Sequence, residues 1–116
     1  MNVAESNVPA YSEFLIPWEE IDISIAEGLK KELNHEMNRD HKLFGREVKA
    51  IAKRKDCDDV LFELMGEGKF AVVHLTWKMS QEKDPEFPWT VLFENWKDVY
   101  ENCIVIDSLD YLNEEF

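Results

Sequence analysis

One apolar stretch, residues 70–77, constrains the fold of this chain more than any other. Seven of its eight residues are apolar or β-branched, and it contains no Gly or Pro. That composition is typical of a strand buried on one or both faces. A second candidate strand, residues 59–64, precedes it, and the five residues between them include two glycines. We therefore predict a β-hairpin at the centre of the fold.

A helix is predicted before this hairpin. Ser24 and Glu27 match a capping box, which places the helix start at Ser24. An apolar stripe recurs every four residues from Ile25 to Met37, so we expect an amphipathic helix over residues 24–38. Residues 14–18 are apolar but interrupted by Pro17, which favours an extended segment at the edge of the sheet.

Further strands and a second helix are expected around the hairpin. Residues 48–53 alternate between apolar and largely basic side chains, and residues 89–93 form a fourth strand candidate. Helical spacing from Asn95 predicts a short helix, residues 104–106 favour β structure, and residues 107–116 form a short helix or a tail. The predicted fold is α+β: a single antiparallel sheet of four to five strands, with the N-terminal helix packed on it and a second helix near the C-terminus.

Length and charge limit the organisation of the protein and its partners. The 116 residues predict one domain, 1–116, with a loosely ordered N-terminal segment of about residues 1–13. The net charge of −12 argues against binding to nucleic acid or to an anionic membrane, and it favours a basic protein partner. Residues 41–60 alone are net basic, at +2. The sequence does not indicate an oligomeric state.

Other features predict a cytoplasmic protein. No apolar run approaches the roughly 20 residues of a membrane helix, and the N-terminal residues do not resemble a signal peptide. Cys57 and Cys103 are therefore expected to be free thiols. The His and Cys residues lack paired zinc-ligand spacing, and no phosphate-loop, dinucleotide or hydrolase motif occurs, so we expect no metal or cofactor.

The central region resembles a known family. The sequences DCDDVLFEL at residues 56–64, AVVHLTW at 71–77 and DPEFP at 84–88 are similar to a pattern, "DCDDVLFEL … VVHLTW … DPxWP", of small bacterial proteins without an assigned function. The similarity extends over about residues 29–100, and Lys78, Met79 and Ser80 depart from the family's Ser-Gly-Lys turn. The resemblance implies a bacterial module but no activity and no catalytic residue.

Two groups of residues are candidates for chemistry. Asp56, Asp58 and Asp59 cluster in a turn, where carboxylates can bind a metal or act as a base, but where Asp also caps local N–H groups. His74 lies among apolar residues, which predicts a buried, hydrogen-bonded side chain. A catalytic alternative pairs His74 with Asp58 or Asp59, with Thr76 on the same strand face.

We expect a non-enzymatic, acidic protein that neutralises a basic protein partner, such as a toxin immunity protein or a phage-type inhibitor. The predicted contact residues are loop and C-terminal acids and one tryptophan: Glu82, Asp84, Glu86, Trp89, Asp107, Asp110, Glu114 and Glu115. One alternative is a housekeeping interaction module that docks through the basic strand 46–55 and the Trp loop, which Trp77, Trp89 and Trp96 flank. The other is a small enzyme that uses His74.

Overall fold

The computed structural model describes residues 6, 8, 9 and 14–114. Most of the predicted loose segment 1–13, and the candidate contact residue Glu115, lie outside this range. The elements are, in chain order, β1 (Trp18–Glu20), α1 (Ile23–Glu36), β2 (Val48–Arg54), β3 (Asp59–Leu64), β4 (Lys69–His74), β5 (Trp89–Phe93), α2 (Trp96–Val99), the π-helical turn η1 (Tyr100–Ile104) and α3 (Val105–Glu114).

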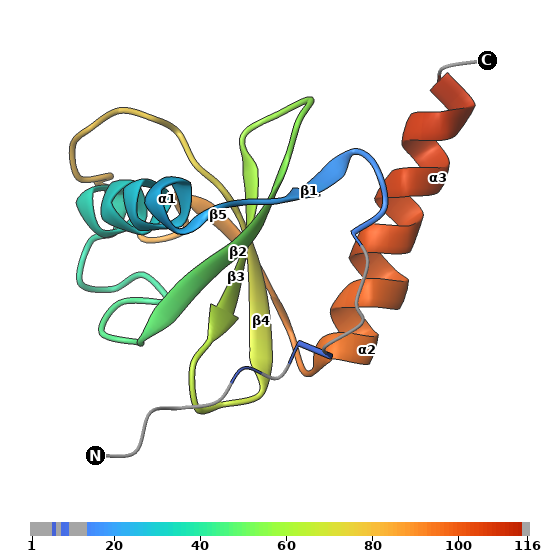
Figure 1. Cartoon of the computed structure of the whole chain (residues 1–116). Coiled ribbons are helices and arrows are strands. Elements are labelled where there is room, and N and C mark those ends of the chain that lie inside the picture. The colour runs from blue at the N-terminus through green and yellow to red at the C-terminus, as the bar shows by residue number, and fades with distance from the viewer. Residues whose placement is uncertain (1–5, 7, 10–13, 115–116) are drawn as a thin grey trace.

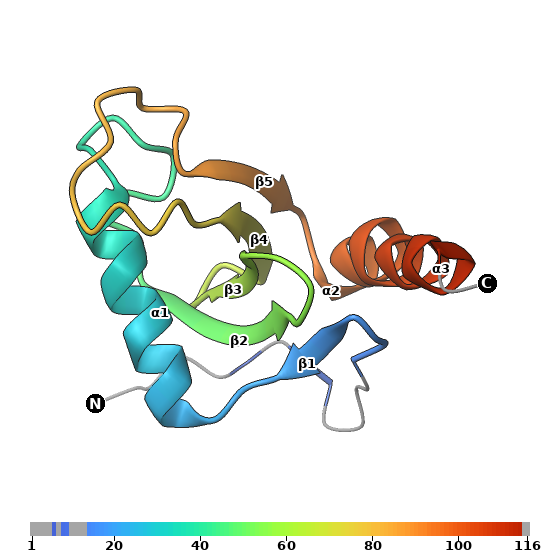
Figure 2. The same cartoon turned by 90° about the horizontal axis from the view of Figure 1, so that it is seen from above.

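The five strands of the described residues form one antiparallel sheet in the order β1-β2-β3-β4-β5. Helix α1 covers one face of the sheet, and the continuous helical segment α2-η1-α3 packs on the other (Figures 1 and 2). We call the second face the outer face. The predicted α+β architecture is confirmed.

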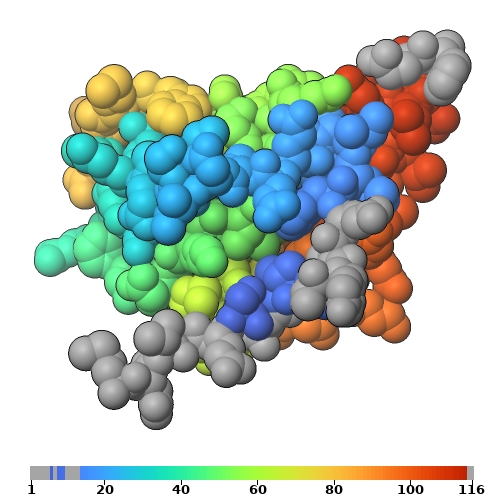
Figure 3. Space-filling view, viewed as in Figure 1, coloured from blue at the N-terminus to red at the C-terminus, as the bar shows by residue number. Residues whose placement is uncertain are grey.

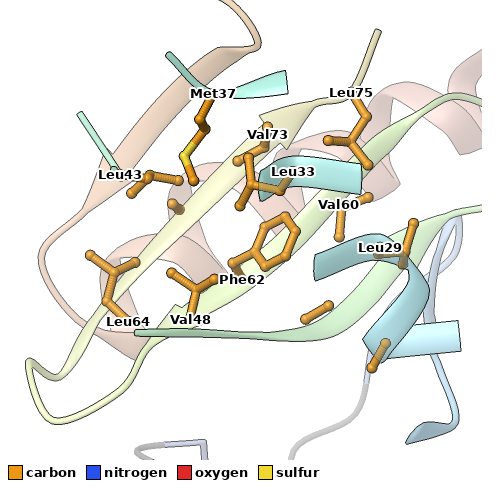
Figure 4. Packing of buried hydrophobic residues seen from close by; sticks show 13 residues of the cluster. Leu29, Leu33, Met37, Leu43, Val48, Val60, Phe62, Leu64, Val73 and Leu75 are labelled. Carbon is orange, nitrogen blue, oxygen red and sulfur yellow. The ribbon is translucent and has the colours of Figure 1, made fainter. Parts of the chain in front are cut away.

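Alternating side chains along the strands build a core on each face of the sheet. On the α1 side, Leu29 and Leu33 pack over Phe62 of β3, all almost fully buried (Figure 4). On the outer face, Leu61 and Phe70 pack against Ile104 of η1. Burying a side chain of this size stabilises a fold by about 1.5–3 kcal/mol, so both layers contribute substantially to the stability of the fold.

The predicted central hairpin is present, with its glycine-containing turn between the two strands. Residues 59–64 pair directly with residues 69–74, with Phe62 opposite Ala71. Gly66 and Gly68 in the connection adopt φ angles of 81° and 71°, a left-handed conformation that glycine tolerates without steric cost. The glycine pair therefore allows the tight reversal that positions both central strands.

Three local predictions were wrong. Asp22, not Ser24, caps α1: its carboxylate accepts the Ile25 N–H at 2.9 Å, and Ser24 donates its hydroxyl to the same carboxylate. The strand predicted over residues 70–77 ends at His74, and Trp77 has a φ of 57°. Residues 104–106, with high β propensity, are helical because Ile104 is buried against the sheet.

No described helix combines the length and the apolar composition that crossing a lipid bilayer requires. Both cysteines are free, as predicted.

Candidate functional site

Part of the outer face carries exposed side chains of mixed chemistry. Asp59, His74 and Trp89 occupy one row across β3, β4 and β5, because Asp59 pairs with His74 and His74 pairs with Trp89. Val91 lies in the next row, opposite Val72. Trp89 is 55% exposed and Val91 is 43% exposed. We call these four residues, Asp59, His74, Trp89 and Val91, the outer corner.

The outer corner is uncovered because the C-terminal helical segment lies over the other end of these strands. Its first helix, α2, places Trp96 edge-on against Phe70, with ring centroids 5.5 Å apart. Phe70 is the second residue of β4, whereas His74 is the last. Trp96, at the covered end, packs against the core, whereas Trp89, at the uncovered end, faces solvent.

The prediction that His74 is buried was wrong. Its side chain is 53% exposed, and its Nδ1 lies 2.7 Å from Asp59 Oδ1. The structure thus joins the two residues of the catalytic alternative. However, no hydroxyl or thiol among the described residues hydrogen-bonds to His74 Nε2, and Thr76 bonds elsewhere. The pair is an exposed histidine–carboxylate contact, and no described hydroxyl or thiol is hydrogen-bonded to the imidazole ring.

A buried carboxylate holds the loop that follows β4. Glu36, at the end of α1, has no exposed surface. It accepts the N–H of Thr76 at 2.8 Å, the hydroxyl of Thr76 at 2.9 Å and the N–H of Trp77 at 2.9 Å. These bonds explain why the strand stops: the backbone turns to present its donors to Glu36 instead of to a neighbouring strand.

Two further carboxylates converge on the same loop. Glu82 accepts from the Thr76 hydroxyl at 3.1 Å and from Lys78 Nζ at 3.3 Å. Glu32, one helical turn before Glu36, accepts the Met79 N–H at 3.4 Å. We call the three carboxylates, Glu32, Glu36 and Glu82, together with residues 76–79, the carboxylate latch. Sequence patterns missed it, although the four-residue spacing of Glu32 and Glu36 places both on one helix face.

The latch changes the acidity of one member. A hydrogen bond to the Glu36 carboxyl, burial and the negative charge of Glu36 raise the pKa of Glu32 to about 7. The Glu32 carboxyl thus retains its proton to a higher pH than an ordinary glutamate and can donate it to Glu36. The arrangement orders the loop that carries Trp77, which is 44% exposed.

The acids predicted as partner contacts separate into two groups. Glu82 is buried in the latch, where its carboxylate has internal hydrogen-bond partners. Asp107 is also engaged internally: it accepts from Trp18 Nε1 at 2.9 Å and lies 3.4 Å from Arg54 Nη1. The exposed acids are Glu86, which is in the loop before β5, and two residues on α3: Asp110 and Glu114. Asp84 is also exposed and caps its own turn by accepting the Glu86 N–H.

Most cations of the predicted basic strand have partners within the molecule. Arg54 forms a two-bond contact with Asp56, at 2.8 and 2.7 Å. Lys53 donates to the carbonyls of Arg54 and Cys57, and Lys55 lies over the Tyr111 ring. This surface therefore offers fewer free charges than the sequence indicated. Asp56 serves as the partner of Arg54, which favours the structural reading of the Asp turn.

A histidine that sequence reasoning passed over links two loops. Buried His41 accepts the Leu43 N–H at Nδ1, 3.0 Å away, so the neutral ring carries its hydrogen on Nε2 and donates it to the Pro88 carbonyl at 2.9 Å. Burial lowers the pKa of His41, which keeps the ring neutral. Pro88 immediately precedes β5, so this contact fixes the start of the strand that carries Trp89.

Neither thiol has the environment of a nucleophile. Burial raises the pKa of both Cys57 and Cys103, the latter also beside Asp107. Among the described residues, no three His, Cys, Asp or Glu side chains are arranged to hold a metal ion.

Comparison of the chain with protein-family models, with curated proteins and with solved structures found no match in any of the three. The resemblance to the small bacterial family therefore stays a prediction.

Proposed function

We propose that this chain is an acidic, non-enzymatic binding protein that neutralises a basic protein partner, in the manner of a toxin immunity protein or a phage-type inhibitor. One observation carries the proposal: Trp89 is 55% exposed on an uncovered sheet face, in a molecule whose net charge is −12. Exposed tryptophans are enriched among the residues that contribute most to protein interfaces. Val91 beside it enlarges the apolar contact.

The distribution of charge supports a basic partner. Asp84 and Glu86 lie in the loop just before Trp89, and Asp110 and Glu114 are exposed on α3. Acidic side chains around an apolar anchor attract a basic surface and speed its association, while the anchor slows its dissociation. The basic strand supports the housekeeping alternative less, because Lys53, Arg54 and Lys55 have internal partners.

The test uses the product of the gene next to the one that encodes this chain. The two proteins are expressed together, and complex formation and rescue of growth are measured with wild-type chain and with Trp89→Asp. Phe44→Asp is the matched control, because Phe44 is 52% exposed but lies in the loop after α1. We expect Trp89→Asp to weaken binding by about 2 kcal/mol or more and Phe44→Asp to leave it unchanged.

Equal losses in the two variants would contradict the outer corner as the binding surface. A neighbouring gene product that is acidic, or that this chain binds without neutralising, would contradict the proposed function.

A further inference from the structure

A groove of about 550 Å³ lies between α1 and the edge of β2, on the face of the molecule seen in Figure 3. Its α1 wall includes Ile23, Ala26 and Lys30. Residues 48–51 of β2 line the groove, and Ser6, Val8 and Phe14 line it as well. This volume is in the range of ligand sites, and the groove shares no lining residue with the outer corner.

The edge of β2 is open in this groove. Strand β1 pairs only with residues 52–54, because the chain leaves the sheet after Glu20 to start α1. The Met65 N–H donates to the Glu47 carbonyl, which fixes the alternation along β2. Lys49 accordingly bonds toward β3, whereas Val48 and Ala50 direct their N–H and C=O groups toward the groove.

These backbone groups have no hydrogen-bond partner among the described residues. Unpaired N–H and C=O groups in regular alternation along a strand edge form a template for another extended chain. A compact small molecule does not repeat donors and acceptors at the spacing of a strand, whereas a peptide backbone does.

We propose that this groove binds an extended, basic peptide segment of a protein partner, which adds to β2 as a strand in line with β1. Alternate side chains of the added segment would face the apolar residues Ala26 and Val48 on the α1 side. The proposal concerns a surface other than the outer corner and does not depend on the function proposed above.

The carboxylates that line the groove favour a basic peptide segment. Glu20, Glu27 and Glu47 line it, and Lys30 is neutralised by Glu47 at 2.8 Å. Lys49 is the other cation of the lining, so carboxylates prevail. A second copy of this chain fits the groove poorly, because two molecules of charge −12 repel each other.

The probe is the capped peptide acetyl-Lys-Val-Lys-Val-Lys-amide, added to ¹⁵N-labelled full-length protein. We expect shifts of the Val48 and Ala50 amide signals and slower hydrogen exchange at both. Two N-methylated peptides test strand addition directly: one is methylated on both valines, the other on the central lysine. Because only alternate N–H groups face β2, one of them should lose about tenfold in affinity, and the other should stay within about twofold.

Two controls test the charge and the place. The acidic peptide acetyl-Glu-Val-Glu-Val-Glu-amide, and the double variant Glu20→Gln, Glu27→Gln with the basic peptide, should each bind several-fold more weakly. The proposal is overturned if several millimolar basic peptide leaves Val48 and Ala50 unshifted, or if both methylated peptides bind equally. It is also overturned if the shifts appear at Val91 instead, or with rising protein concentration alone, which would identify a second copy as the occupant.

Discussion

At the scale of single residues, the clearest feature is the pair of carboxylates on consecutive turns of α1. Glu36 has no exposed surface and is bonded to the loop, and Glu32 lies beside it with a pKa raised to about 7. An unfolded chain releases the Glu32 proton near pH 4.5, whereas the folded chain retains it until about pH 7. The contribution of Glu32 to stability is thus greatest in acid and is lost as the pH rises through this window.

Glu32→Gln is expected to stabilise the protein at pH 8 relative to wild type by on the order of 2 kcal/mol, with a smaller effect at pH 5. The reason is that the amide cannot ionise beside Glu36. One pKa unit corresponds to about 1.4 kcal/mol before solvent screening. Urea unfolding at the two pH values measures this difference. Glu27→Gln, on an exposed face of the same helix, is the control.

Comparison between variants is needed because His41 acts in the opposite direction. Burial lowers its pKa, so its contribution to stability falls as the pH drops below about 6.5. His41 is present in both the wild type and the Glu32→Gln variant. Subtracting their profiles of unfolding free energy against pH therefore isolates the contribution of Glu32. An unchanged difference between pH 5 and pH 8 would contradict the shared proton.

His74→Ala is expected to change the free energy of unfolding by less than about 1 kcal/mol, since an exposed contact with the Asp59 carboxylate contributes little. The neighbouring Leu75 is 1% exposed in the α1-side core, and Leu75→Ala should cost about 2–5 kcal/mol. Thermal or urea unfolding of the two variants provides the comparison. A large loss in His74→Ala would mean that the contact with Asp59 organises the end of the hairpin.

At the scale of elements, β5 is an edge strand of the sheet, and a lysine forms a hydrogen bond with one of its edge carbonyl groups. Lys42, in the loop after α1, donates from Nζ to the Thr90 carbonyl at 3.0 Å. That carbonyl is the kind of edge acceptor that another strand would otherwise use. The strand it protects is apolar on both faces, with Trp89, Val91 and Leu92 all partly exposed.

Lys42→Met is expected to increase self-association, because it frees the Thr90 carbonyl and adds apolar surface at the edge. Sedimentation velocity over a range of concentrations measures the change. Lys31→Met removes the same charge from an exposed position on α1 and should remain at the wild-type distribution. Similar behaviour of the two variants would show that the loss of charge, not the open edge, controls association.

The elements that composition and alternation predict well are those whose structure depends on their own residues. Residues 59–64 and 89–93 are strands with the predicted bounds. Trp77 could not be predicted, because its turn depends on a carboxylate 41 positions earlier. The exposure of His74 depends on where the C-terminal helices end on the outer face, and no local pattern specifies that. Trp89 was predicted as a contact residue from its residue type. It is exposed because the C-terminal helices leave this part of the outer face uncovered.

At the scale of the whole molecule, the excess of acidic residues should govern how fast a basic partner arrives. The screening length falls from about 10 Å at 0.1 M salt to about 3 Å at 1 M. Association should therefore slow by about one to two orders of magnitude over this range, with little change in dissociation.

Stopped-flow measurements with the partner from the neighbouring gene test this expectation. Neutralising Asp84 and Glu86 together, or Asp110 and Glu114 together, locates the face that the partner approaches. Glu82 and Asp107 are left intact, because their carboxylates have internal bonds. An association rate that is indifferent to salt and to both double variants would contradict electrostatic attraction of the partner.

The number of residues in the π-helical turn η1 sets the direction in which the side chains of α3 point, and the composition of the helix does not show this. A π turn holds more residues than an α turn, so the helix beyond it is rotated by about 100° for each extra residue. In this phase Asp107 meets Trp18 and Arg54, while Ile106, Leu109 and Leu112 face outward. Removing one residue from η1 would turn that apolar stripe and withdraw the carboxylate. In this helix, a change of length is therefore a more severe mutation than most changes of side chain.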